Sequence, residues 1–161
     1  MTLDEARARR SDLRANQQPL VLTNGHFDLL HVGHLDYLEK ARALGAALYV
    51  GVNDDAGTRR LKGVGRPLIP AHERARLLAA LAPVTAVILF SEDTAEALIT
   101  ALQPEIYVKG GDYALADAVS PTRKALPEAA VVQHYGGQIV FIDYLPNHST
   151  SDLIARVKAL R

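Results

Sequence analysis

The sequence contains no cysteine and carries no net charge. The absence of cysteine excludes disulfides, thiolate nucleophiles and cysteine-ligated zinc sites. Eighteen basic residues balance eighteen acidic ones, so no overall positive field is available to attract nucleic acid. Any anion that the protein binds must therefore be held by a local cluster of side chains.

Long apolar segments are also missing. No apolar run approaches the roughly 20 residues that a membrane-spanning helix needs, and Met1 is followed by TLDE rather than by a basic and then apolar leader. With 48% hydrophobic and 22% charged residues, the chain of 161 residues has the size and composition of one folded domain. We therefore expect a single domain over residues 1–161, a cytoplasmic location, and neither membrane nor nucleic acid as a partner.

Short apolar runs alternate with helical patterns along the chain. We expect strands at residues 20–23, 47–52, 84–90, 106–109 and 138–142. We expect helices at residues 2–16, 31–44, 54–60, 71–81, 94–102, around 127–135 and 149–160. This alternation predicts an α/β fold, a three-layer Rossmann-like arrangement around a five-stranded parallel sheet, with the ligand crevice outside the carboxyl ends of the strands.

Residues 23–34 (TNGHFDLLHVGH) follow the first expected strand and open the next helix. A helix N-terminus attracts phosphate through its free backbone N–H groups and its dipole. His31 and His34 are three residues apart across this helix start, so their side chains can face the same way. Their imidazoles would add hydrogen-bond donors, and the segment therefore indicates a phosphate-binding site.

The same segment resembles the signature of the cytidylyltransferase-like nucleotidyltransferases, which belong to a superfamily that includes the class I aminoacyl-tRNA synthetases. The resemblance is closest to the adenylyltransferases that form ADP-heptose from ATP and heptose 1-phosphate, and it covers roughly residues 19–158. It implies that His31 and His34 stabilise the transition state. Asp28 is expected either to contact the substrate or to hold the loop by hydrogen bonds. The residues expected to bind the nucleotide here are Asn24, Gly25, His26, Phe27 and Gly33, although His26 replaces a residue that is usually small in the family.

Two basic residues farther along resemble phosphate ligands of the family. Lys62 lies in a stretch rich in glycine and proline (RLKGVGRP, residues 60–67), which predicts a mobile loop that closes over a triphosphate. We expect Lys62 to be catalytic. Arg74 corresponds to the family's helix arginine, although His72 stands where a glutamate is usual and the glutamate here is Glu73. Its guanidinium is expected to clamp phosphate oxygens, and the structural alternative is a surface arginine paired with Glu73.

The fourth expected strand runs into residues 107–113 (YVKGGDY). This string is typical of the heptose-phosphate adenylyltransferases rather than of the glycerol-phosphate cytidylyltransferases. Lys109, Gly110 and Asp112 are therefore expected to contact the sugar phosphate or the nucleotide. The glycines of this string permit a close approach to the backbone.

Residues 149–151 resemble the Ser-Thr-Thr triplet with which the family binds nucleotide phosphates at a helix start. We expect Ser149, Thr150 and Ser151 to bind the nucleotide, and Ser149 is also a candidate N-cap. The sequence departs from the family just before this triplet, where Asn147 and His148 replace a pair that usually contains glycine. The segment at residues 127–128 also lacks a glycine that the closest relatives tend to have.

These observations predict an enzyme that transfers AMP from ATP to heptose 1-phosphate, with pyrophosphate as the second product. The acceptor phosphate is already ionised, so alignment and charge stabilisation suffice and no protein nucleophile is needed. The resemblance implies Mg²⁺ as cofactor, with protein ligands that the sequence does not identify, and a homodimer. Three alternatives remain open: a cytidylyltransferase that uses CTP and a polyol phosphate such as glycerol 3-phosphate, a nucleotide-binding protein without catalysis, and a zinc hydrolase built on His26, His31 and His34.

Overall fold

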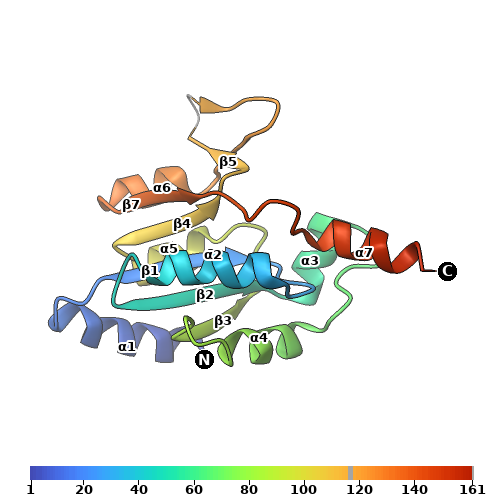
Figure 1. Cartoon of the computed structure of the whole chain (residues 1–161). Coiled ribbons are helices and arrows are strands. Elements are labelled where there is room, and N and C mark those ends of the chain that lie inside the picture. Colours follow the sequence, from blue (N-terminus) through green and yellow to red (C-terminus); the bar gives the residue numbers. More distant parts are fainter. Residues whose placement is uncertain (116–117, 161) are drawn as a thin grey trace.

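A computed structural model describes residues 1–115 and 118–160 of the chain. Its main sheet has five parallel strands in the order β3-β2-β1-β4-β7 (Figure 1). The strands are β1 (Leu20–Gly25), β2 (Ala47–Asn53), β3 (Ala86–Phe90), β4 (Ile106–Gly110) and β7 (Gln138–Ile142). The α/β fold with a five-stranded parallel sheet is therefore confirmed.

Each expected helix occurs, with ends that differ by a few residues. The helices are α1 (Leu3–Ala15), α2 (Val32–Arg42), α3 (Asp55–Lys62), α4 (Ala71–Ala79), α5 (Glu96–Leu102), α6 (Ala129–His134) and α7 (Thr150–Lys158). Thr2, Asp54 and Ser149 are N-caps whose side chains accept a backbone hydrogen bond from the first turn, so they lie just outside the helices that they begin. Within the described ranges no helix is long and apolar enough to cross a membrane.

A two-stranded ribbon was not expected from the sequence. It pairs β5 (Tyr113–Ala114) with β6 (Lys124–Ala125) in parallel. Two-residue strands carry too few residues for an alternating apolar pattern to show in the sequence. The ribbon stands beyond the end of β4, at the top of Figure 1.

Side chains that alternate along the strands build two apolar layers. Leu20 and Leu22 of β1 pack on one face of the sheet, in a cluster that includes buried residues of α1, α5 and α6. Val21 points to the other face, where it packs with residues of α2 and α4. Figure 1 shows α2 across the near face of the sheet. Helices therefore cover both faces, which confirms the expected three layers.

The chain reverses its direction of travel across the sheet at β1. It passes from β1 outward to β2 and β3, and then returns to place β4 on the other side of β1. Ligands of open parallel sheets bind at such a switch point, outside the carboxyl ends of the strands. Here those ends are Asn24 and Gly25 on β1 and Lys109 and Gly110 on β4.

Arg74 of α4 lies in the interior with 0% of its surface exposed. Its Nε donates to the carbonyl of Ile69 at 2.9 Å, and its Nη1 donates to the carbonyl of His26. Its Nη2 donates to the carbonyl of Asn53 and to Oδ1 of Asp55, both at 2.9 Å. One guanidinium therefore joins the loop after β1, the end of β2 and the starts of α3 and α4.

This position corrects the expectation that Arg74 clamps a phosphate. Its guanidinium faces backbone carbonyls in the interior, and Arg74 is absent from the walls of the cavity described below. The surface alternative is also wrong, because the ion partner of Arg74 is Asp55 and not Glu73. The spacing in the sequence identified a constrained arginine, but it could not tell which way the side chain points.

Replacement of this arginine should destabilise the fold. We expect Arg74→Ala to lower the free energy of unfolding by about 3 kcal/mol or more, because buried carbonyls and Asp55 lose their partner. Urea unfolding followed by circular dichroism measures the change. Arg76→Ala, an exposed position on the same helix, should cost less than about 0.5 kcal/mol. Equal and small losses in both variants would show that the guanidinium does not hold the strand ends.

Candidate active site

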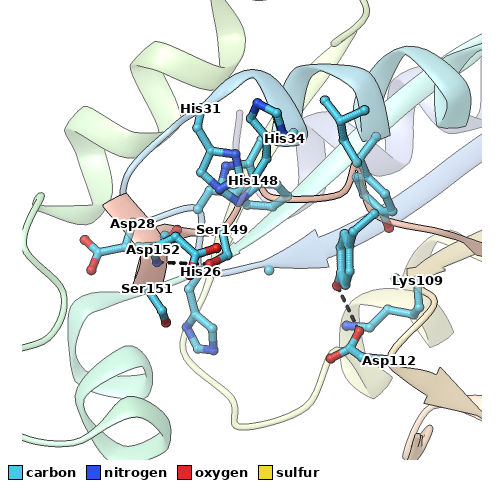
Figure 2. Close-up of a pocket in the computed structure, with 18 of the residues that line it drawn as sticks. His26, Asp28, His31, His34, Lys109, Asp112, His148, Ser149, Ser151 and Asp152 are labelled. Carbon is cyan, nitrogen blue, oxygen red and sulfur yellow. Dashed lines mark hydrogen bonds between the residues drawn. The ribbon is translucent and has the colours of Figure 1, made fainter. Parts of the chain in front are cut away.

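A cavity of about 800 Å³ lies at the predicted edge of the sheet. Segments far apart in the sequence form its walls: the loop from β1 to α2, the end of α3, the exit of β4 and the chain from residue 144 to residue 152 (Figure 2). All the predicted site residues except Arg74 line it, namely Asn24, Gly25, His26, Phe27, Asp28, His31, Gly33, His34, Lys62, Lys109, Gly110, Asp112, Ser149, Thr150 and Ser151. The structure therefore brings the predicted residues to one place.

His31 and His34 stand together at the start of α2. His31 is the N-cap residue with extended backbone, and its side chain does not cap the helix. The two rings stack with centroids 3.9 Å apart, and Phe27 lies 5.3 Å from the ring of His34. The Nδ1 atoms of both histidines are buried and have no hydrogen-bond partner within the described residues. Buried polar atoms are rarely left unpaired, so this arrangement of the two rings is unusual for a purely structural pair.

Three histidines of the cavity wall, His26, His31 and His34, have lowered pKa values. Burial, together with the neighbouring His31, lowers the pKa of His34 from 6.5 to about 4. Burial, with the charges of Lys62 and Arg74, likewise lowers the pKa of His26 to about 4. The pKa of His31 is lowered by burial and by His148. Without a ligand, these side chains therefore offer neutral imidazoles near pH 7 rather than a cluster of cations.

Gly33 allows two walls of the cavity to meet. A Cβ atom at this position would lie 2.9 Å from Cβ of His148 and 3.0 Å from Nδ1 of His31, closer than such contacts normally occur. Glycine is therefore needed between His31 and His148 in this packing. Asn147, the residue before His148, has a φ of 63°. This is the left-handed conformation, which asparagine tolerates better than most residues.

Lys109 places a buried cation at the end of β4, with 7% of its surface exposed. Its Nζ donates to Oδ1 of Asn24 at 3.1 Å and lies 4.6 Å from the centroid of the Tyr113 ring. Burial lowers its pKa. Among the described residues, no carboxylate forms an ion pair with Lys109. The carboxylates of Glu128 and Asp112 act on it without a direct ion pair, and a buried ammonium on a cavity wall favours an anionic ligand there.

Asp28 holds a loop rather than facing a substrate. Its Oδ2 accepts from Nη1 of Arg66 at 2.7 Å, and its Oδ1 accepts from the backbone N–H groups of Leu68 and Ile69 at 2.7 and 3.1 Å. Burial alone would raise the pKa of Asp28, but these hydrogen bonds outweigh it and leave the pKa lowered. Of the two roles expected from the sequence, the structure shows the one in which Asp28 fixes the loop.

Tyr144 is a residue of the site that the sequence reasoning missed. Its hydroxyl donates to Oδ1 of Asp112 at 2.9 Å. The ring rests on Gly110, where an added Cβ would lie only 1.8 Å from the phenol oxygen. A signal was available, because Tyr144 follows the carboxyl end of β7 as Asp112 follows that of β4. Thr58, which shares a hydrogen bond of 3.1 Å with Nδ1 of His26, lies within α3 and had no such signal.

Helix ends place the remaining predicted residues. Lys62 is the last residue of α3 and not part of a loop, which corrects that expectation, and the loop begins at Gly63. Ser149 is the N-cap of α7, and its Oγ accepts from the backbone N–H of Asp152 at 3.0 Å. The N-cap expected from the sequence is therefore confirmed, and the N-termini of α2 and α7 both line the cavity.

The zinc-hydrolase alternative finds no support in the geometry. Across residues 1–115 and 118–160, no group of three histidine or carboxylate side chains is placed to hold a metal ion. Two of its three proposed ligands, His31 and His34, stack ring on ring instead.

The lowered pKa of His34 predicts a stability that depends on pH. Between pH 6.5 and about 4 the unfolded chain takes up a proton at His34 that the folded chain does not, so the folded state loses stability as the pH falls through this window. We expect the free energy of urea unfolding to fall by a few tenths to about 2 kcal/mol between pH 7 and pH 5. His34→Gln, which does not titrate, should reduce this dependence, while His26 and His31 keep the remainder of it. An unchanged slope in this variant would contradict the shift.

Comparison with known proteins agrees with the fold and the site. The profile of the cytidylyltransferase-like family matches residues 22–156. A solved structure, the lipopolysaccharide core biosynthesis protein from Thermoplasma volcanium, superposes with a TM-score of 0.63 at 24% identity, over 80% of this chain and 97% of that one. At this identity the likeness supports the fold alone.

Curated relatives share more of the sequence. The bifunctional protein HldE of Streptomyces coelicolor is 47% identical over 153 residues, which cover 95% of this chain and 31% of that protein. HldE of Geotalea uraniireducens is 50% identical over 139 residues, or 86% of this chain and 27% of the relative. The chain therefore spans less than a third of the length of these relatives. From the family match over most of its length, the chain belongs to the cytidylyltransferase-like family of nucleotidyltransferase enzymes.

Proposed function

We propose that this chain transfers AMP from ATP to heptose 1-phosphate, giving ADP-heptose and pyrophosphate. The observation that carries the proposal is the cavity itself, in which the N-termini of α2 and α7 face one space with the buried ammonium of Lys109. Two helix N-termini and a cation favour a polyanion with several phosphates. The resemblance of residues 107–113 to the heptose-phosphate adenylyltransferases, with the 44–50% identity to HldE proteins, supports the choice of ATP and heptose 1-phosphate.

The proposed reaction is a single displacement at phosphorus. An oxygen of the acceptor phosphate attacks the α-phosphorus of ATP, and the bond from that phosphorus to the oxygen bridging to the β-phosphate breaks, so that pyrophosphate leaves with the bonding electrons. His31 and His34 donate hydrogen bonds to oxygens of the α- and β-phosphates as negative charge grows there. Lys62 contacts the outer phosphates, and Lys109 holds the acceptor phosphate in line.

The donor set fits a magnesium ion that enters with the nucleotide. Mg²⁺ is commonly held by substrate phosphates, water and one or two carboxylates rather than by a protein cage. The cavity offers few free carboxylate oxygens, since those of Asp28 bind the loop and one of Asp112 accepts from Tyr144. Bound Mg²⁺ would neutralise phosphate charge. The chain's own residues still align the two phosphates. A homodimer and a cytoplasmic location, both implied by the sequence, are part of the proposal.

A panel of substrates tests this assignment. We expect ATP with heptose 1-phosphate to exceed CTP with glycerol 3-phosphate in kcat/KM by at least about tenfold, or about 1.4 kcal/mol, because a site built for one base leaves buried polar groups unpaired with another. Pyrophosphate release measures the rate for each pair. Preference for CTP would keep the nucleotidyltransferase chemistry and remove the ADP-heptose assignment. Binding without release of pyrophosphate would favour a nucleotide-binding protein.

The stacked histidines, His31 and His34, should contribute strongly to kcat. We expect His31→Ala and His34→Ala each to lower kcat by about 10²-fold or more, since donors aimed at the transition state typically contribute that much. His72→Ala, an exposed histidine on α4, is the matched control and should leave kcat unchanged. Circular dichroism checks that each variant is folded. Turnover like that of the unmodified chain in either variant would remove the catalytic role.

A further inference from the structure

His148 lies on the cavity wall and belongs to none of the residue sets predicted from the sequence. It directly precedes Ser149, the N-cap of α7, and its side chain is exposed. Its Nδ1 lies 2.7 Å from the carbonyl oxygen of Pro146. A carbonyl oxygen can only accept a hydrogen bond, so Nδ1 carries a proton and donates it. The other ring nitrogen, Nε2, is then the atom that can meet a ligand.

The position of His148 is where two helix N-termini meet. Its Cβ and Nδ1 of His31 both lie about 3 Å from the point that a Cβ of Gly33 would occupy, at 2.9 and 3.0 Å. Gly33 belongs to the first turn of α2, an eleven-residue helix, and His148 adjoins the first turn of α7, a nine-residue helix. Figure 2 shows His148 beside His31 and His34. An anion bound by either helix N-terminus is therefore within reach of this ring.

We propose that His148 is a third imidazole of the phosphate subsite, whose Nε2 donates a hydrogen bond to an oxygen of the polyphosphate held between α2 and α7. The proposal rests on the proposed function for the identity of the anion. Because Nδ1 already donates to Pro146, a second donation from Nε2 requires the protonated ring. The bound anion thus gains a charge-assisted hydrogen bond, which is stronger than one from a neutral donor.

The groups around His148 are compatible with this state. The titratable side chains that line the cavity from the elements beside it are His31 at the start of α2, His34 and Tyr37 of α2, Asp152 of α7 and Tyr144 ahead of the same loop. The lowered pKa values of His31 and His34 favour uncharged rings beside His148. His148 would then supply charge at the helix N-termini that the stacked pair does not.

His148→Ala removes the imidazole ring but keeps the Cβ atom that packs against Gly33. The close contact with Gly33 is made by Cβ of His148, and His148→Ala keeps that atom. The fold should therefore persist while the proposed hydrogen bond is lost. His148→Gln adds back a neutral donor, and His134→Ala removes an exposed histidine near the end of α6 as a matched control.

Calorimetric titration of the purified chain with inorganic pyrophosphate tests the proposal without turnover. We expect His148→Ala to weaken the dissociation constant about tenfold, in keeping with the loss of one charge-assisted hydrogen bond. His148→Gln should recover part of that loss, and His134→Ala should bind like the unmodified chain. Unaltered affinity in His148→Ala would overturn the assignment.

Two further outcomes separate this inference from the proposed function. An unmodified chain that binds no pyrophosphate would overturn both, since neither the subsite nor the reaction would then exist. An unmodified chain that binds pyrophosphate but turns over no nucleotide, with weaker binding in His148→Ala, would overturn the proposed function and support His148 as an anion ligand.

Discussion

The buried guanidinium of Arg74 is the contact on which the shape of the cavity depends, because it joins parts of the chain that meet only at the sheet's carboxyl edge. Its donors reach the carbonyls of His26, Ile69 and Asn53. A guanidinium suits this role since its planar fork presents several donors in fixed directions. The charge is compensated by Asp55, whose side chain is 41% exposed, so the interaction is as much a set of charge-assisted hydrogen bonds to the backbone as an ion pair. Arg74 therefore fixes the loop that carries His26 from the interior side of the loop. The residues that line the cavity do not have to hold this loop in place.

The electrostatics of the cavity depend on which of its charged side chains already bind protein groups. Asp28 is bound by Arg66 and the backbone of the following loop, and Asp112 accepts from Tyr144, so much of the carboxylate charge on the walls is directed to protein partners. Lys109 has no ion pair among the described residues and donates only to Asn24. An environment of free donors and occupied acceptors stabilises a polyanion without rearrangement when it binds, which is the condition for preorganised catalysis.

The sequence predicted the parts of this arrangement that follow from strand ends and helix starts. Apolar runs located all five main strands, and the rule that ligands bind at their carboxyl ends located the crevice. The resemblance of residues 107–113 to the family then led to Lys109 and Gly110, and the helix start after β1 led to His31 and His34. The sequence does not specify the direction of a side chain on a helix. Arg74 was therefore expected to bind phosphate, whereas its guanidinium binds backbone carbonyls in the interior. Lys62 was placed in a loop because nearby glycines and a proline favour an irregular chain, yet α3 extends to it, with Gly63 as its C-cap at a φ of 89°. Tyr144 and His148 lie between β7 and α7. The position of Tyr144 after a strand end was a usable signal, whereas no local pattern specifies the path that brings His148 beside His31.

The coupling between Gly33 and His148 explains why a departure from the family's sequence need not disturb the fold. Asn147 keeps the left-handed turn that a glycine would supply, and the absence of a side chain at Gly33 leaves the space into which His148 packs. The backbone path into α7 is thereby retained while an imidazole is added to the wall. Imidazoles suit such a wall, since they can be buried uncharged when the cavity is empty and can take up a proton when a polyanion supplies the compensating charge. Histidine clustering at two helix N-termini therefore lets the empty protein avoid the repulsion that lysines in the same positions would create.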